Sequence, residues 1–237
     1  MTPAATRTGA RTGVRWTDVY RDRRAWEREH PAADRLTRWV DEHLMAPHPD
    51  LGRDGPVCPF VRHSIVRRTF WAGLAPGGDE LTIPALQRIV DDAFAVYADL
   101  RAENPSELRS VTLVTLFPGL TRCDLIDTVH RSRKTEAVTH GLMIGQFYPG
   151  CPVPGLWNRD FRPLDAPVPM LVLRKMMSTD FPFLVARTDW LYAYFTQVAP
   201  ALPSRLRWAI AERMRMDGPA VGEITALRAH STGEHAT

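Results

Sequence analysis

Hydrophobic positions recur every three or four residues in several stretches of the chain, which is the spacing of an amphipathic helix. The clearest stretch is residues 81–104, where one face carries Leu86, Ile89, Val90, Ala93, Val96, Tyr97 and Leu100. Asn104 and Pro105 end this pattern, because the residue before a proline disfavours helical backbone. The same spacing predicts further helices over residues 16–29, 32–45, 121–140, 189–199 and 204–216.

Short apolar stretches rich in β-branched residues separate these helices and predict strands. The stretch LRSVTLVTLFPG is apolar along most of its length, which is typical of a strand buried on both faces. Three more strands are expected, over residues 64–74, 141–149 and 169–176. The pattern predicts an α+β fold: a small, mostly antiparallel sheet with helices packed on one face, and helical N- and C-terminal segments.

The 237 residues are 44% hydrophobic, which is enough for one core, so we expect a single domain over residues 14–228. Residues 1–13 and 229–237 are small and polar, and we expect both ends to be disordered.

Charge and cysteine content narrow the class of protein. The net charge is +3, which is too balanced to favour a nucleic-acid partner. A basic amphipathic helix over residues 204–218 keeps that alternative open, although its Trp208, Ile210 and Met214 need burial. Three cysteines without a signal peptide or an apolar span predict a soluble, cytoplasmic protein with reduced thiols and no membrane contact.

Well-known catalytic patterns are missing from the sequence. It has no glycine-rich phosphate loop, no nucleophile elbow and no histidine or cysteine pairs at zinc spacing. Candidate chemistry therefore depends on individual residues in loops and at the ends of elements.

The segment THGLMIGQFYPGCPVPGLWNRDF, residues 139–161, combines a histidine, a cysteine and several glycines and prolines. Proline restricts the unfolded chain, so its density here favours a fixed path over a flexible linker. We interpret the segment as an organised binding loop with His140 at a helix-to-strand junction. His140 is either an exposed cap near the helix end or an axial ligand to haem iron, with Gly141 allowing a flat ligand to approach.

A second loop, VCPFVRH, contains Cys58 and His63. Cys58 is either a buried structural cysteine or a thiolate ligand to haem. His63 is a candidate for the distal pocket, for catalysis or for an alternative ligand.

Basic residues are candidates for binding carboxylates. His130, Arg131, Arg133 and Lys134 form a patch on one predicted helix, which is either a solvated face or an anion clamp. Arg162 and Arg174 could serve the same purpose. Arg174 is the more informative, because a guanidinium in an apolar strand is costly unless it is paired.

The remaining candidates concern the substrate. Asp180 either caps a turn or binds a substrate ammonium group. Phe147 and Trp157, with other aromatic residues nearby, could wall a flat hydrophobic pocket.

Four motifs together resemble a known family: VCPFVRH, HRSRK, HGLMIGQFYPGC and P-x-P-M-L-x-x-R. They are similar to those of the YqcI/YcgG-type haem enzymes of natural-product pathways, which N-oxygenate amines or guanidines of amino acids and include lysine N-oxygenases. The resemblance covers about residues 47–185 and maps no ligand securely, so the axial ligand stays open among His140, Cys58, His63 and His130.

The resemblance implies a haem-dependent monooxygenase with haem b as cofactor and dioxygen as co-substrate. It implies an amino-acid substrate, an external electron donor and a possible homodimer. Arg174 would then bind the substrate carboxylate, and Asp180 would hold its ammonium and relay protons. A non-catalytic haem- or ligand-binding accessory protein is the alternative, and a cofactor-free enzyme is a further one.

Overall fold

The computed structural model describes residues 6–103 and 110–216, which build a six-stranded sheet in the order β1-β2-β3-β4-β6-β5. Only the pair β3–β4 is parallel, so the expected mostly antiparallel sheet is confirmed. The strands are β1 (Thr6–Thr8), β2 (Arg15–Asp18), β3 (Phe70–Leu74), β4 (Thr112–Leu116), β5 (Leu142–Phe147) and β6 (Met170–Lys175).

Helices make up the rest of the regular structure, which confirms the α+β class. The α-helices are α1 (Arg23–Glu29), α2 (Pro31–Trp39), α3 (Val61–Val66), α4 (Ile83–Glu103), α5 (Cys123–Thr139), α6 (Thr188–Val198) and α7 (Ser204–Met214). A π-helical turn, η1 (Val40–Leu44), continues α2. Short 3-10 turns are η2 (Pro49–Leu51), η3 (Gly78–Glu80) and η5 (Ser178–Phe183).

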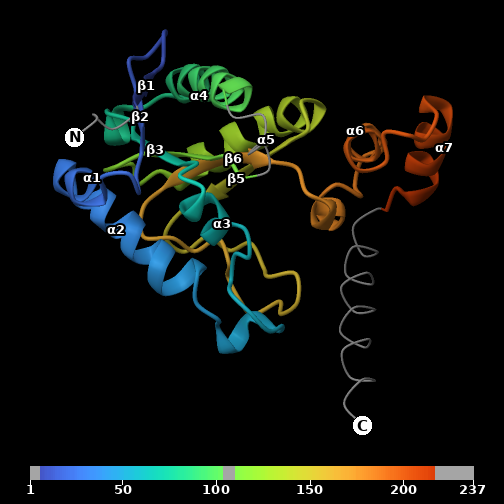
Figure 1. Ribbon diagram of the computed structural model, residues 1–237, viewed down its shortest axis with the longest axis horizontal. Helices are drawn as coiled ribbons and strands as arrows, with labels where there is room; N and C mark the ends of the chain where they lie inside the picture. The colour runs from blue at the N-terminus through green and yellow to red at the C-terminus, as the bar shows by residue number, and fades with distance from the viewer. Residues whose placement is uncertain (1–5, 104–109, 217–237) are drawn as a thin grey trace.

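Helices cover both faces of the sheet, so the expectation of helices on one face is wrong (Figure 1). Side chains alternate along each central strand: Trp71 and Leu113 pack under α4 and α5, while Phe70 and Val114 pack against α1, α2 and α3. Because successive residues of a strand point to opposite faces, a strand that is apolar at every position requires two apolar layers.

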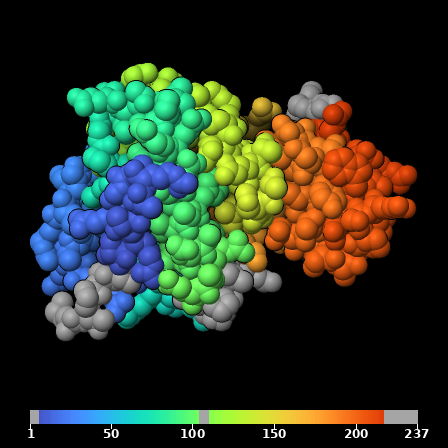
Figure 2. Space-filling view, turned by 90° about the horizontal axis from the view of Figure 1, so that it is seen from above, coloured from blue at the N-terminus to red at the C-terminus, as the bar shows by residue number. Residues whose placement is uncertain are grey.

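The C-terminal helices form a separate lobe beside the sheet edge at β5 (Figures 1 and 2). Small apolar clusters around Leu184 and Leu191 hold η5, α6 and α7 together. The expected helical C-terminal segment is therefore confirmed as far as residue 216.

The expected helix over residues 16–29 is wrong for its first part, which is strand β2. Trp16 is fully buried, and its Nε1 donates a hydrogen bond of 3.1 Å to Oγ1 of Thr115 in β4. Burial alternates along residues 15–18 with the period of two that is typical of a strand. Tertiary packing therefore determines the secondary structure of this stretch. Similarly, the strand expected over residues 64–74 begins only at Phe70, after α3.

Residues 6–13 are ordered, which corrects the expectation of disorder over residues 1–13. They form a hairpin with β2, and the buried carboxylate of Asp92 in α4 fixes its turn. Asp92 accepts hydrogen bonds from the backbone N–H groups of Arg11 and Thr12 and from the Thr12 hydroxyl, at 2.7–3.1 Å. A Cβ on Gly9 would lie 2.4 Å from Asp92 Oδ2, so this position requires glycine. Residues 1–5 and the C-terminal tail at 229–237 lie outside the described residues.

We predict that Asp92→Asn lowers the free energy of unfolding by about 1–3 kcal/mol, because the amide presents its own donors to N–H and O–H groups. Urea unfolding measures the loss, and faster hydrogen exchange of residues 9–14 localises it. Asp99→Asn, on the exposed side of the same helix, is the matched control. Equal stability of the two variants would contradict this role of Asp92.

Candidate functional site

A cavity of about 810 Å³ lies where the η1 turn, the η2 loop and the segment after β5 meet. We call it the histidine pocket. Its lining includes Trp39, His43, His48, Asn158, Phe161 and Arg162. Three carboxylates, of Asp50, Asp160 and Asp165, also line it, so aromatic rings and charged groups share the pocket.

His43 lies in the π-helical turn that continues α2. The backbone N–H of Met45 donates to the carbonyl of Val40 at 2.9 Å, so the turn contains one residue more than an α-helical turn. Such turns within helices are frequent at functional sites. Trp39 and His43 are four positions apart, so they lie on the same helix face, and both line the pocket with ring centroids 5.8 Å apart.

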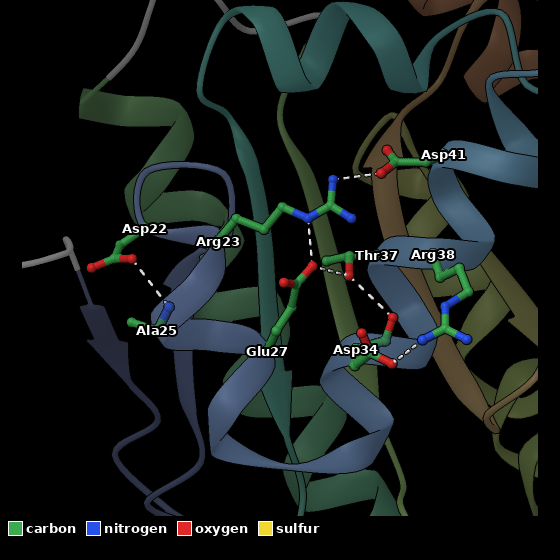
Figure 3. A network of polar contacts seen from close by, with 8 residues as sticks. All are labelled: Asp22, Arg23, Ala25, Glu27, Asp34, Thr37, Arg38 and Asp41. Atoms are coloured by element: carbon green, nitrogen blue, oxygen red, sulfur yellow. Dashed lines mark hydrogen bonds and ion pairs between the residues drawn. The ribbon is translucent and has the colours of Figure 1, made fainter.

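A network of charged residues holds α1 against α2 and η1 (Figure 3). The guanidinium of Arg23 forms ion pairs with Glu27 in its own helix and with Asp41 in η1. The Thr37 hydroxyl donates to Glu27 at 2.7 Å. The network fixes the start of η1 from the side opposite the pocket.

The loop after β5 is organised, as its prolines predicted. The backbone N–H of Gly150 donates to Asp165 at 2.8 Å, and that of Gly155 donates to the carbonyl of Phe161 at 2.8 Å. The Asn158 amide donates to the carbonyl of Asp50 at 2.8 Å and joins this loop to the η2 loop. The fixed path is therefore confirmed for this loop, and its role in ligand binding stays a prediction.

His43 lies between two aromatic rings. Its ring is stacked with Trp39, and its centroid is 6.1 Å from that of Phe161. Its Nε2 is buried and has no hydrogen-bond partner among the residues that the structure describes. Burial first, and the neighbouring His48 second, lower the pKa of His43, against an opposing effect of Asp165. The ring is therefore neutral at pH 7.

His48 has a defined tautomer. Its Nδ1 accepts a hydrogen bond of 3.2 Å from the backbone N–H of Asp50, so in the neutral ring Nε2 carries the proton. A metal-ligating histidine usually has the opposite arrangement, with its second nitrogen donating to an acceptor. His48 is accordingly suited to donate a hydrogen bond to a ligand.

None of the four proposed axial ligands lines the histidine pocket. His140 is exposed at the end of α5, where its Nδ1 donates to the carbonyl of Glu136 at 2.9 Å. His63 is exposed on α3. His130 is buried under β5, and its Nε2 donates to the carbonyl of Ile144 at 3.2 Å. Burial lowers the pKa of His130 to about 4.

Arg174 and Asp180 form a bidentate ion pair, with both N–O distances 2.7 Å. Asp180 is only 2% exposed and also accepts from the backbone N–H of Met177 at 2.7 Å. Burial lowers the pKa of Arg174, but Asp180 outweighs this effect and the net pKa is raised. Half-buried Cys58 and the Phe60 ring lie nearby, with Phe60 5.6 Å from the guanidinium. Asp180 is therefore the counterion that Arg174 requires, and the charges of the two side chains are used in pairing with each other.

Two of the basic residues expected to form a patch on α5 instead connect this helix to neighbouring helical segments. Arg133 pairs with Asp91 in α4 and with Glu136, and Lys134 donates to the carbonyl of Phe183 at 3.3 Å. Arg131 is exposed. The patch is outside the histidine pocket, and of the proposed carboxylate-binding arginines only Arg162 lines it.

The proposed aromatic wall is partly present. Phe147 packs edge-on against Trp39, with centroids 5.8 Å apart, and so supports the pocket from behind. Trp157 lies against Gly52 of the η2 loop, where a Cβ would be 3.0 Å away. The sequence interpretation missed His43 and His48. Their signal was two histidines five positions apart at the end of a predicted helix.

The fold is of the α+β class, and it carries a pocket lined by aromatic rings and histidines. The chain belongs to the family described as Domain of unknown function (DUF6875), whose model matches residues 33–209. No curated protein and no solved structure matches the chain.

Within residues 6–103 and 110–216, no three histidine, cysteine or acidic side chains gather as a set of metal ligands. No helix in the same part of the chain has both the length and the apolar character of a membrane span.

We predict that burial of neutral His130 makes stability depend on pH. The unfolded state binds the proton more readily, so the stabilisation is complete above pH 6.5 and is lost as pH falls toward 4. The full loss is about 3 kcal/mol. Urea unfolding at pH 7 and pH 4.5 should show a smaller pH dependence for His130→Gln than for wild type. An equal dependence in both proteins would contradict the prediction.

For the Arg174–Asp180 pair, we expect Arg174→Met to lower the free energy of unfolding by about 2–4 kcal/mol, because it leaves a buried carboxylate without its counterion. The control is Arg187→Met, which breaks an exposed pair with Asp189 and should cost less than about 1 kcal/mol. Chemical denaturation of both variants makes the comparison. A loss no larger in Arg174→Met than in the control would leave Arg174 available for a ligand.

Proposed function

We propose that the protein is an enzyme that binds haem b in the histidine pocket and N-oxygenates the amine or guanidine of an amino acid. The buried, unpartnered Nε2 of His43 carries this proposal. A neutral imidazole in apolar surroundings is the usual protein ligand of haem iron. The family resemblance of the sequence supplies the reaction class.

The pocket residues fit haem in three respects. His43 is neutral and its Nε2 lacks a partner; because this atom is buried, iron binding requires the ring to turn toward the pocket. Trp39 and Phe161 provide apolar rings for a flat macrocycle, and Arg162 provides a cation for its carboxylates. His140 has the tautomer of a ligand but is exposed. We therefore place the axial ligand at His43 instead of His140.

Haem, when bound, supplies the activation of dioxygen with two electrons from an external donor. The chain's own residues handle the substrate. Nε2–H of His48 donates to a substrate oxygen, and the aromatic walls exclude water. A desolvated pocket lowers the pKa of an amine, which keeps its nitrogen lone pair available for oxidation. Arg174 and Asp180 support the fold from outside the pocket and take no part in these steps.

The first test is a hemin titration followed by visible absorption of the wild type and two single variants. We expect the wild type to show a Soret band, His43→Ala to lose it and His140→Ala to keep it. If His140→Ala loses the Soret band and His43→Ala keeps it, His140 is the axial ligand. A wild type that does not bind hemin would refute the haem proposal.

A turnover assay distinguishes an enzyme from a non-catalytic haem carrier. Haem-loaded protein, supplied with reductant and dioxygen, should consume a basic amino acid and release an N-oxygenated product detectable by mass spectrometry. Haem binding without product from any proteinogenic amino acid would favour the non-catalytic accessory role. Cytoplasmic location and a homodimer stay predictions of the sequence.

A further inference from the structure

The C-terminal lobe, made of η5, α6 and α7, exposes most of the large apolar side chains that reach the surface. Of the six such side chains exposed in the described part of the chain, five belong to this lobe: Phe183, Val198, Leu206, Trp208 and Met214. The lobe stands out from the body of the molecule beside β5 (Figures 1 and 2). A concentration of exposed apolar surface usually marks an interaction site.

Three apolar residues of α7 form a ridge along this helix, which we call the α7 ridge. Leu206, Ile210 and Met214 are spaced at intervals of four, so they lie on one side of α7. Leu206 and Met214 are 46% and 38% exposed and Ile210 is half-buried, whereas Ala211 is fully buried in a cluster with Leu191 of α6. α6 therefore covers one side of α7, and the described residues leave the ridge largely uncovered.

Charge distinguishes two possible occupants of the α7 ridge, which are a second copy of the chain and another segment of the same chain. Residues 204–215 contain four arginines and one acid, Glu212, which accepts a hydrogen bond of 2.8 Å from Nε1 of Trp208. Two copies of α7 packed ridge to ridge would bring these arginines together, and like charges across an interface repel each other. The ridge therefore favours a partner that has acidic residues beside its apolar ones.

The sequence after Met216, DGPAVGEITALRAHSTGEHAT, has this composition. It contains three acids and one arginine, so its charge is opposite to that of α7. Its aliphatic residues Val221, Ile224 and Leu227 recur at intervals of three, which is a spacing typical of one helix face.

This segment also starts at the right place to reach the ridge. It follows the C-terminal end of α7, where the backbone N–H of Met216 donates to the carbonyl of Val185 at 2.8 Å. Gly218 and Pro219 are turn-forming residues, so the chain can reverse its direction there. The α7 ridge is about 12 Å long, a length that eight helical residues match.

We propose that residues 217–228 bind back along α7 and place Val221, Ile224 and Leu227 on the α7 ridge. The segment runs antiparallel to α7, so that Val221 lies toward Met214 and Leu227 toward Leu206. Its acids then lie beside the arginines of α7. Because a short link joins the two parts of one chain, the high effective concentration of the segment favours this contact over binding of a second copy. The contact is separate from the histidine pocket and does not depend on haem.

The test is hydrogen exchange of the full chain, measured by mass spectrometry, in the wild type and in the double variant Ile224→Asp, Leu227→Asp. We expect the amides of α7 to exchange at least ~10-fold faster in this variant, because α7 loses the burial of its ridge and opens more readily. Exchange of β4, in the core, should not change. The matched control is Ala226→Asp, Ala229→Asp, which adds the same charge on the opposite side of a helix and should leave α7 protected as in the wild type.

A variant of the ridge tests the other side of the contact. Leu206→Asp should speed the exchange of residues 220–228 at least ~10-fold, because these residues lose their apolar contact with α7. Circular dichroism verifies that each variant is folded.

Equal exchange of α7 in the wild type and in Ile224→Asp, Leu227→Asp would overturn the proposal. An equal effect of the Ala226→Asp, Ala229→Asp control would also overturn it, because added charge alone would then explain the result. Light scattering over a range of protein concentrations tests the other occupant. Protection of α7 that appears only together with a dimer would assign the ridge to a second copy.

Discussion

Burial of both faces of β3, β4 and β6 is the constraint on which the rest of the structure depends. These strands are apolar on each side, so the sheet needs two covering layers. The long helix α4 and α5 provide one layer. The other layer is built from α1, α2 and α3, which are shorter, and from the segment that precedes β6. The histidine pocket lies in this second, more irregular layer, where loops as well as helices must cover the sheet.

That irregular layer explains how a pocket can persist beside a packed core. Leu36 of α2 and Val40 of η1 pack on the sheet, while Trp39 at the end of α2 and His43 in η1 face the loop after β5. Arg23 holds the turn through Asp41, and Asn158 holds the loop through the carbonyl of Asp50. The cavity therefore depends on polar contacts at its rim more than on further apolar packing, which would fill it.

Sequence patterns predicted the elements whose periodicity is strong, and missed those decided by tertiary contacts. Helix α4 was predictable because its apolar face continues for several turns. Strand β2 was not, because Trp16 is also compatible with a helical pattern and is placed by its hydrogen bond to Thr115. The sequence identified the loop after β5 and Arg162 as part of a site. It did not identify His43, although this residue follows Trp39 by four positions and therefore shares its face of the predicted helix.

Whether a charged or polar side chain already has a partner within the protein distinguishes a structural role from a candidate functional one. Arg174 and Asp180 were attractive candidates as single residues, but they bind each other and use their charge to fix the turn after β6. His43, by contrast, has an unpartnered ring nitrogen and lines a cavity. A buried polar atom without a partner carries a free-energy cost, which a bound ligand can remove.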